Sequence, residues 1–380
     1  MTRIFVIAGE ASGDVLGHRL MTALHRLDPD IVFSGIGGER MGEAGLHSLF
    51  PMQELAHMGL AEILPKIFHL LRRINQTIAA IRAEKPDILV TIDSPGFTLR
   101  VLKAIGSGGP KRVHYVAPQV WAWRQSRVKH FPGLWDELLC LLPFEPAFFA
   151  PHGLHPVFTG HPVLESGADK GDAQAFRSRN NLTPDAVPVM LMPGSRVTET
   201  KRLLPVFRQT LALLNAEEKK LVPVLAAAAG VADAVAAQTA DWAVRPIIVR
   251  GVAERYDAFA ACRVALTKSG TSTLELAMAG VPMAVTYRVN PISGFLGRRL
   301  IKVPHVAMIN LLARRALVPE LLQEDCRPDT LATTLLGLLR DPIKAEVQRT
   351  GFAGALASLR APEGMPSAAA AKAILAVLSA

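Results

Sequence analysis

Two short segments in the second half of the chain combine glycine and hydroxyl residues with a charged side chain. They are Leu-Met-Pro-Gly-Ser-Arg, residues 191–196, and Leu-Thr-Lys-Ser-Gly-Thr-Ser-Thr-Leu-Glu, residues 266–275. Each follows an apolar run and is predicted to open a helix, where backbone N–H groups lack partners and bind phosphate. Arg196 can grip a diphosphate through its guanidinium, and Glu275 can accept hydrogen bonds from a ribose diol. Together the segments indicate a site for a sugar nucleotide diphosphate.

The later segment has a second interpretation. Residues 272–275, Ser-Thr-Leu-Glu, also fit a helix capping box, which many helices contain without any ligand. We favour phosphate binding because a diphosphate needs two such turns in one α/β unit and few other ligands do. The residues expected to bind the sugar nucleotide are Gly194, Ser195, Arg196, Ser269, Gly270, Thr271, Ser272 and Glu275.

Three carboxylates in the first half follow predicted strands and are candidates for acid–base chemistry. Glu10 and Asp14 lie in the loop after the first strand, and Asp93 ends the run 88–92 before a Pro/Gly turn. Open α/β sheets bind ligands beyond the carboxyl ends of their strands, so these loops are expected to face the substrate. A helix start for Asp14 and an Asx turn for Asp93 are structural alternatives. The sequence leaves open which carboxylate is the general base.

Signals for metals are weak. Residues 28–30, Asp-Pro-Asp, match the D-x-D pattern of metal-dependent sugar-nucleotide enzymes, but they precede a predicted strand, at the edge away from the ligand-binding loops. Three histidines between residues 152 and 161 alternate with prolines and have no carboxylate among them. We therefore expect neither a metal nor another cofactor. The segment 116–124 contains two Trp and an Arg that could bind a sugar face or an acyl chain, although Trp is more often a core residue.

The composition predicts a globular protein with anionic partners. The chain has 380 residues, enough for two α/β domains, and half of them are hydrophobic. Its formal net charge is +9, which favours phosphorylated ligands, an acidic membrane surface or nucleic acid. We expect no nucleic acid, because the basic residues are dispersed and aromatic residues are few.

The cysteines and the start of the chain indicate a cytoplasmic location. Cys140, Cys262 and Cys326 are widely spaced, odd in number and free of metal-ligand spacing, so they are predicted to be reduced thiols. The first residues lead directly into a predicted strand without a signal sequence, and no apolar run reaches the ~18 residues that a membrane span needs.

The order of apolar runs predicts the architecture. Strand-like runs alternate with helical patterns at 4–8, 31–36, 88–92, 112–116 and 138–142, and again at 187–192, 221–225, 247–249, 264–266 and 283–286. This alternation is typical of parallel sheets covered by helices on both faces. We expect an α/β protein with two doubly wound domains, 1–165 and 166–365, and a last helix in 366–380 that packs back on the first domain.

Two apolar and basic segments suggest contact with a membrane interface. Residues 58–73 combine an apolar face, with Met58, Leu60, Ile63, Leu64, Ile67 and Phe68, and a basic set, Lys66, Arg72 and Arg73. Residues 294–302 have the same mixture. An ordinary packing helix is the alternative for the first segment.

The ordered motifs resemble the lipid-A-disaccharide synthase family from about residue 4 to about residue 323. The resemblance rests on Gly-Glu-Ala-Ser-Gly-Asp at 9–14, Met-Gly-Leu-Ala-Glu at 58–62, Ile-Asp-Ser-Pro-Gly-Phe at 92–97, Val-Ala-Pro-Gln-Val-Trp-Ala-Trp-Arg at 116–124, Leu-Pro-Phe-Glu at 142–145, Gly-His-Pro at 160–162, Pro-Gly-Ser-Arg at 193–196, Ser-Gly-Thr at 269–271 and Asn-Leu-Leu at 310–312. His18 departs from the small residue that is common after Gly17 in the family, so its role is open.

The resemblance implies a GT-B glycosyltransferase, with two Rossmann-like domains that face a central cleft. It implies an inverting transfer from UDP-2,3-diacylglucosamine to 2,3-diacylglucosamine 1-phosphate, which releases UDP and makes the lipid A anchor of Gram-negative outer membranes. Asp93 matches the family's required aspartate, Arg196 the arginine of its phosphate turn, and Asn310 its asparagine in the nucleotide site. Peripheral association with the cytoplasmic leaflet of the inner membrane follows from the lipid substrates. A homodimer is a further expected partner, although the sequence does not fix the oligomeric state.

Two other functions fit part of the same pattern. A UDP-N-acetylglucosamine 2-epimerase would use the same scaffold and nucleotide, but its reaction has no need for lipid-facing apolar surfaces. A non-catalytic protein that binds anionic lipid would explain the net charge and residues 58–73, but it leaves the two phosphate-type turns unused.

Overall fold

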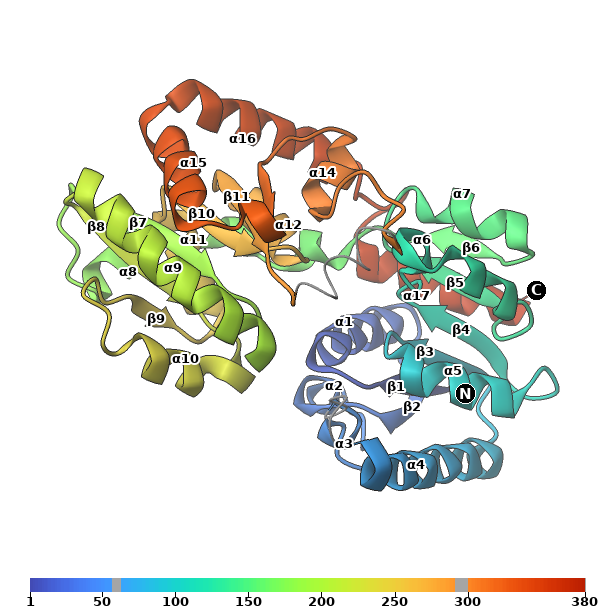
Figure 1. Ribbon diagram of the computed structural model, residues 1–380. Helices are drawn as coiled ribbons and strands as arrows, with labels where there is room; N and C mark the ends of the chain where they lie inside the picture. Colours follow the sequence, from blue (N-terminus) through green and yellow to red (C-terminus); the bar gives the residue numbers. More distant parts are fainter. Residues whose placement is uncertain (57–62, 291–299, 380) are drawn as a thin grey trace. The chain divides into compact units, whose positions relative to one another are not determined.

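The computed structural model describes residues 1–56, 63–290 and 300–379. The chain divides into two compact units, each built on a six-stranded sheet (Figure 1). Unit 1 comprises Met1–Pro162 and Leu359–Ala380, and unit 2 comprises Val163–Ser358. The sequence predicts boundaries after residues 165 and 365, and the structure divides after residues 162 and 358. The predicted fold class, α/β with two parallel sheets, is confirmed.

The sheet of unit 1 is parallel throughout and has the order β2-β1-β3-β4-β5-β6. Its strands are β1 (Arg3–Ala8), β2 (Val32–Ile36), β3 (Ile88–Ile92), β4 (Lys111–Tyr115), β5 (Glu137–Cys140) and β6 (Pro156–Phe158). The chain winds outward in one direction from β1 to β2 and in the other from β3 onward. The carboxyl ends of β1 and β3 therefore form the topological switch point, where sheets of this type bind their ligands.

Helices cover both faces of this sheet (Figure 1). They are α1 (Ala11–Leu27), α2 (Glu39–Glu43), α3 (Gln53–Ala56), α4 (Ile63–Glu84), α5 (Pro95–Ile105), α6 (Val120–Trp123), α7 (Glu145–Phe149) and α17 (Pro366–Ser379). The last helix packs beside α1, because Ala370, Ile374 and Val377 recur at helical spacing and join the buried cluster of the sheet. The end of the chain therefore completes the core of unit 1.

The sheet of unit 2 is also parallel, with the order β12-β11-β10-β7-β8-β9. Its strands are β7 (Val187–Met192), β8 (Leu221–Ala226), β9 (Ile247–Val249), β10 (Val264–Lys268), β11 (Met283–Tyr287) and β12 (Glu320–Leu322). This is the Rossmann strand order, and its switch point lies between β7 and β10. Both predicted phosphate turns begin at the carboxyl ends of these two strands.

The helices of unit 2 bury the two faces of its sheet. They are α8 (Ala173–Arg179), α9 (Val197–Glu217), α10 (Ala232–Thr239), α11 (Val252–Ala261), α12 (Ser272–Met278), α14 (Met308–Ala313), α15 (Pro328–Arg340) and α16 (Pro342–Ala357). Helices α9 and α15 pack on each other and share one buried cluster with strands β7, β8 and β10.

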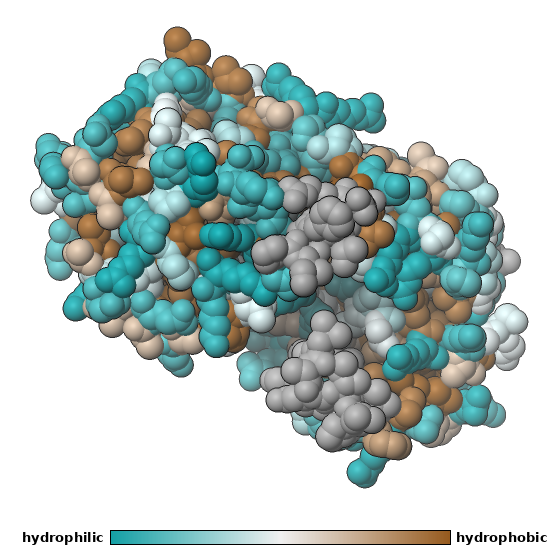
Figure 2. Space-filling view, viewed as in Figure 1, coloured by the Kyte–Doolittle hydropathy of each residue, from teal (hydrophilic) through white to brown (hydrophobic). Residues whose placement is uncertain are grey.

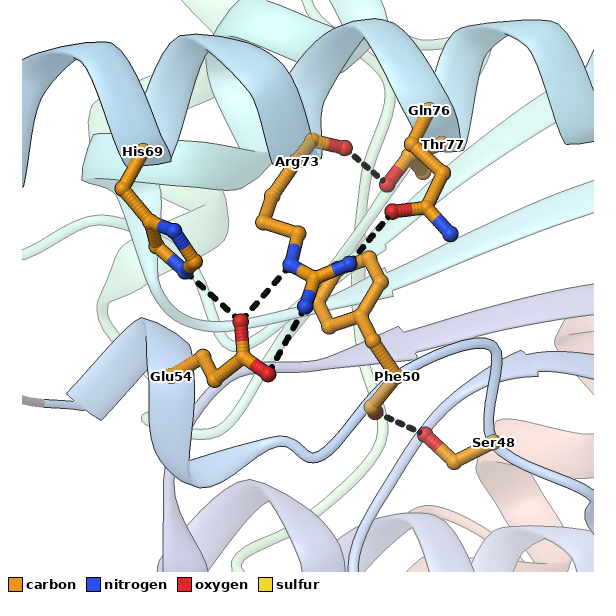
Figure 3. A network of polar contacts seen from close by, with 7 residues as sticks. All are labelled: Ser48, Phe50, Glu54, His69, Arg73, Gln76 and Thr77. Carbon is orange, nitrogen blue, oxygen red and sulfur yellow. Dashed lines mark hydrogen bonds and ion pairs between the residues drawn. The ribbon is translucent and has the colours of Figure 1, made fainter.

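Hydrogen bonds and ion pairs around Glu54 connect helix α4 to α3 (Figure 3). The Arg73 guanidinium donates to both carboxylate oxygens, from Nε at 2.7 Å and Nη2 at 2.8 Å, and His69 Nε2 lies 2.6 Å from the same group. Arg73 also lies over the Phe50 ring, 4.6 Å from its centroid. These contacts turn Arg73 toward the protein, which corrects the prediction that it lies near lipid headgroups.

The outer surface of α4 carries exposed hydrophobic side chains. Phe68 is 74% exposed and Leu71 is 44% exposed, whereas Leu70 and Ile74 are buried. Figure 2 shows hydrophobic side chains at the surface in this part of unit 1. The predicted apolar residues Met58 and Leu60, and residues 294–299 of the second segment, lie outside the described residues. In the part of the chain that the structure describes, no helix is long and apolar enough to cross a bilayer.

Candidate active site

Two candidate acid–base residues lie together at the switch point of unit 1. Strands β1 and β3 are neighbours, and Ala8 is opposite Ile92 in their register. Glu10 precedes α1 as its N-cap residue, and Asp93 follows β3 directly. Their carboxylates are close enough for the charge of Glu10 to act on Asp93. The fold thus groups two of the three candidate carboxylates where an open α/β sheet presents its ligand-binding loops.

Backbone strain is concentrated at the same edge of the sheet. Asp93 and Ser94 adopt left-handed conformations with φ of 49° and 47°, and Val116, which follows β4, has φ of 78°. A β-branched residue at positive φ is an outlier, and each such conformation costs about 1–3 kcal/mol. The Asp93 N–H donates to the Tyr115 carbonyl at 2.9 Å, which helps to hold the turn. Strain that the surroundings impose in this way is typical of functional sites.

Gly9 allows the loop after β1 to approach the turn after β3. A Cβ atom at Gly9 would lie 2.4 Å from Ser94 Oγ and 2.8 Å from Ser94 Cβ, so no larger residue fits without a shift of the turn. The Ser94 hydroxyl is buried and has no hydrogen-bond partner among the described residues. A buried hydroxyl without a partner is costly, so the Ser94 hydroxyl is a natural contact for a bound polar ligand.

The environment of Asp93 suits a proton acceptor. Burial raises the pKa of the Asp93 carboxyl above its usual range, the nearby Glu10 carboxylate raises it further, and a hydrogen bond from the Ser94 backbone opposes both. Glu10 itself is exposed. A carboxylate with a raised pKa is a stronger base, and burial with a like charge nearby is the usual means of raising it.

Asp14, the third candidate, has a structural role. Its two carboxylate oxygens accept hydrogen bonds from the backbone N–H groups of Gly38 at 2.8 Å, Met41 at 3.0 Å and Arg40 at 3.1 Å. They therefore satisfy the free donors at the start of α2. His18, one turn further along α1, contacts the Arg40 carbonyl at 2.7 Å. These three donors occupy the Asp14 carboxylate, which favours Asp93 and Glu10 over Asp14 as the base.

The two tryptophans of segment 116–124 have different environments. Trp121 is buried, and its indole N–H donates to the Glu145 carboxylate at 3.0 Å, so it belongs to the core. Trp123 is 42% exposed, and the Arg124 guanidinium lies over its ring, 4.2 Å from the centroid. Only Trp123 presents an aromatic face to solvent.

The first turn of unit 2, residues 193–196, differs from the prediction in one respect. The backbone N–H groups of Ser195 and Arg196 are not free, because Glu199 Oε2 accepts from them at 3.1 and 3.4 Å. Glu199 Oε1 pairs with Lys268 Nζ at 3.1 Å. The Arg196 side chain is exposed and has no hydrogen-bond or ion-pair partner among the described residues. This turn therefore offers a ligand the guanidinium of Arg196 and the hydroxyl of Ser195.

The second turn keeps free backbone donors. The N–H groups of Gly270, Thr271 and Ser272 donate no hydrogen bond within the described part of the chain. The Ser269 hydroxyl donates to the Val306 carbonyl at 2.6 Å, so this side chain supports the turn and is less available to a ligand. Ser272 Oγ lies 3.3 Å from Thr267 Oγ1.

Glu275 lies on the first turn of α12 but does not cap it. Its Oε1 accepts hydrogen bonds from Tyr256 Oη at 2.9 Å and Arg255 Nη2 at 3.0 Å. Burial, and then the Glu275 carboxylate, raise the pKa of Tyr256, which keeps its hydroxyl a donor. The capping-box interpretation of residues 272–275 is therefore wrong, and Oε2 has no partner among the described residues.

Asn310 is a structural residue in this structure. It is fully buried, its Nδ2 donates to the Val318 carbonyl and to Glu320 Oε1, and its Oδ1 accepts from the N–H groups of Leu317 and Val318. Glu320 in turn accepts from the N–H groups of Val306 and Ala307. All the hydrogen-bonding groups of the Asn310 amide are occupied within the protein, so its contact with the nucleotide stays a prediction. Through Val306, the network that contains Asn310 supports the Ser269 turn.

The Asp-Pro-Asp segment lies in a turn of unit 1. The Asp28 carboxylate accepts from the Asp30 N–H at 3.0 Å, in a turn that precedes β2 at the amino edge of the sheet. Within residues 1–56, 63–290 and 300–379, no three or more His, Cys, Asp or Glu side chains are grouped so that they could hold a metal ion.

Comparison with known proteins gives the family. The sequence model described as "Lipid-A-disaccharide synthetase" matches residues 4–373. The chain is 57% identical over 376 residues to the lipid-A-disaccharide synthase of Gluconobacter oxydans, and the match covers 99% of this chain and 91% of that protein. It is 54% identical over 386 residues to the enzyme of Granulibacter bethesdensis, with 99% and 98% covered.

Solved structures share the fold at low sequence identity. The UDP-GlcNAc 2-epimerase of Neisseria meningitidis, solved with UDP-GlcNAc, superposes with a TM-score of 0.65 at 10% identity and covers all of both chains. The calicheamicin glycosyltransferase CalG4 superposes with a TM-score of 0.59 at 16% identity and covers 100% of this chain and 98% of that one. These likenesses concern the GT-B-like fold alone, whereas the family match extends over nearly the whole sequence. The chain therefore belongs to the lipid-A-disaccharide synthase family, the glycosyltransferases of lipid A biosynthesis.

Proposed function

We propose that this chain transfers 2,3-diacylglucosamine from UDP to the 6-hydroxyl of 2,3-diacylglucosamine 1-phosphate, with inversion, and releases UDP. Membership of the family supplies the reaction. The observation that carries the residue roles is that Asp93 and Glu10 lie at the switch point of one sheet, and Arg196 and Glu275 at that of the other. Sheets of this type bind substrates at these points.

Unit 2 is the proposed donor unit. The Arg196 guanidinium and the free N–H groups of residues 270–272 would bind the diphosphate, and Glu275 Oε2 would accept from the ribose. As the sugar leaves, negative charge grows on the phosphate, and donors that are already in place stabilise it in the transition state. Arg255 and Tyr256 would keep Glu275 in position.

Unit 1 is the proposed acceptor unit, with Asp93 as the general base. Positive charge develops at the anomeric carbon of the donor while Asp93 takes the proton of the attacking 6-hydroxyl. The Glu10 carboxylate would raise the basicity of Asp93, and the Ser94 hydroxyl would hydrogen-bond the acceptor sugar.

Replacement of Glu10 by Gln is expected to shift the pH dependence of kcat. Protonation of Asp93 inactivates it as a base, so kcat falls as the pH drops through the raised pKa of Asp93. The Gln variant lacks the like charge, which lowers the pKa of Asp93 and moves this fall to lower pH. Glu39→Gln, an exposed residue of α2, is the control. A pH profile that does not move would show that Glu10 does not tune Asp93, and complete loss of activity would point to Glu10 as the base.

The reaction is expected to proceed without a divalent metal. The Arg196 guanidinium and the backbone donors of residues 270–272 supply positive charge at the leaving diphosphate. Dialysis against EDTA should therefore leave the rate of UDP release unchanged. Loss of activity that Mg²⁺ or Mn²⁺ restores would refute this expectation.

We further propose that the protein is cytoplasmic and docks on the inner membrane through α4. Both substrates carry acyl chains, and Phe68 and Leu71 present large apolar side chains to solvent on this helix. Arg72 is exposed beside them, where it could contact anionic headgroups.

The double variant Phe68→Ser/Leu71→Ser is expected to weaken binding to anionic phospholipid vesicles. Burial of apolar side chains in the interface drives such binding, so its loss should reduce co-sedimentation while UDP affinity stays unchanged. Ile343 and Val347 on α16 are also exposed, at 74% and 53%, and Ile343→Ser/Val347→Ser is the matched control. Equal co-sedimentation of both variants and the parent would favour the packing-helix interpretation of α4.

The second candidate function is a UDP-GlcNAc 2-epimerase, an enzyme that shares this fold. Incubation with UDP-GlcNAc alone, followed by NMR of the sugar nucleotide, separates the two functions. We expect no epimer, because the proposed base acts on an acceptor hydroxyl. Formation of a 2-epimer in the absence of any acceptor would support the epimerase.

A further inference from the structure

The carboxylate of Glu199 joins the two donor turns of unit 2. Its Oε2 accepts from the backbone of the first turn, at Ser195 and Arg196, and its Oε1 pairs with Lys268 at 3.1 Å. Lys268 is the last residue of β10 and leads directly into the second turn. Strands β7 and β10 are neighbours, with Met192 opposite Thr267, so this one side chain spans the switch point.

The Glu199–Lys268 ion pair is largely buried. The Glu199 side chain is only 7% exposed and that of Lys268 21% exposed, so both charges are largely removed from water. Gly194, with φ of 115°, makes room for the carboxylate, because a Cβ there would lie 2.3 Å from Glu199 Oε2. A buried pair of this kind depends on both partners, since removal of one leaves the other charge uncompensated.

The Arg196 guanidinium lies near this pair and is available to a ligand. Glu199 neutralises Lys268, whereas the neighbouring Arg196 has no partner among the described residues. Burial and then the Glu199 carboxylate raise the pKa of the Tyr287 hydroxyl, at the carboxyl end of β11, while the charges of Arg196 and Arg202 oppose this rise. An anion at the first turn can therefore bind the Arg196 guanidinium, but the backbone N–H groups of Ser195 and Arg196 are already occupied by the Glu199 carboxylate.

We propose that Glu199 and Lys268 are positioning residues that hold the first donor turn, with Arg196, at the distance from the second turn that a diphosphate requires. The inference rests on the proposed function, because it assumes that unit 2 binds UDP. The pair acts through Arg196 and through the N–H groups of residues 270–272. Glu199 makes three polar contacts and is nearly buried, so it remains in place when the ligand binds.

The test compares UDP with uridine on the parent and on Glu199→Gln, Lys268→Met and Lys268→Arg. Titration calorimetry measures UDP, and ligand-observed NMR measures uridine. We expect Glu199→Gln and Lys268→Met to lower UDP affinity roughly 5–30-fold, with uridine affinity unchanged because only the diphosphate needs the alignment. Lys268→Arg restores the ion pair and should bind UDP within about threefold of the parent. Lys220→Met, which breaks an exposed pair with Asp185, is the control.

The other outcomes are distinct. Higher UDP affinity in Glu199→Gln would mean that Glu199 competes with the phosphate, which overturns the positioning role. Unchanged UDP affinity in folded Lys268→Met, or equal losses for UDP and uridine, would also overturn it. Should Glu199→Gln fail to fold, the Lys268 series decides the matter. Absence of UDP binding by the parent would instead refute the proposed function on which the inference rests.

Discussion

Asp93→Asn is expected to lower kcat by about 10²–10⁴-fold while UDP affinity and thermal stability stay near the parent values. Asn has the size of Asp and keeps most of the hydrogen-bonding capacity of the turn, but it cannot take a proton. The backbone N–H of Asp93 donates to the Tyr115 carbonyl, and its own carbonyl accepts from the Thr98 hydroxyl, so both turn contacts survive the replacement.

Steady-state kinetics with both lipid substrates, together with thermal melting and UDP titration, checks this expectation. A fall in kcat alone identifies Asp93 as the base. Persistence of activity together with a lower melting temperature would mean that Asp93 only supports the turn. In that case Glu10 would be the remaining candidate, because the carboxylate of Asp14 is occupied by the start of α2.

Arg196→Ala is expected to weaken UDP binding about ten- to hundredfold, since a charge-assisted hydrogen bond contributes about 1.5–3 kcal/mol. The exposed guanidinium has no hydrogen-bond or ion-pair partner among the described residues, so its loss leaves no uncompensated charge in the fold. The backbone N–H that donates to Glu199 is retained in Ala. The melting temperature should therefore stay close to that of the parent.

Calorimetric titration with UDP measures the effect of Arg196→Ala. Arg327→Ala, which removes an exposed arginine paired with Asp329, is the control for loss of one positive charge. Equal UDP affinity in the folded Arg196→Ala protein and in the parent would remove Arg196 from the donor site.

Ten of the twelve strands that the structure describes could be predicted from the sequence because they are short, continuous apolar runs between loops. Strands β3, β7 and β9 begin and end at the predicted residues. The two strands that the sequence did not predict, β6 and β12, have three residues each and form sheet edges. Strand β9 is equally short and also forms an edge, but its three residues are all large and apolar, whereas β6 begins with Pro156 and β12 with Glu320.

The sequence predicts the position of those site residues that directly follow a strand. Loops at the carboxyl ends of β1, β3, β7 and β10 lie at the switch points because of strand order. The sequence alone does not show which groups a polar side chain contacts, and the contacts of Asp14 and Asn310 could therefore not be predicted. Their partners are backbone groups 24–27 residues away for Asp14 and a tight local network for Asn310.

Glu199 and Lys268 were missed although one signal was present. Glu199 stands three positions after Arg196, the N-cap residue of α9, which is the glutamate half of a capping box. This pattern was considered for residues 272–275, where Glu275 instead binds Arg255 and Tyr256. The two segments look alike in sequence. Glu199 accepts from the backbone at the start of its own helix, whereas Glu275 binds two residues of the neighbouring helix α11, and the local sequence does not distinguish these cases.

The central claim, glycosyl transfer between two acylated substrates, is tested most directly by the release of UDP. The purified parent chain would be incubated with UDP-2,3-diacylglucosamine alone, with 2,3-diacylglucosamine 1-phosphate alone, and with both, and UDP and lipid products would be quantified by mass spectrometry. We predict UDP only when both substrates are present, in equal amount to a disaccharide 1-phosphate. Release of UDP without the acceptor, or no disaccharide when both substrates are supplied, would contradict the assignment.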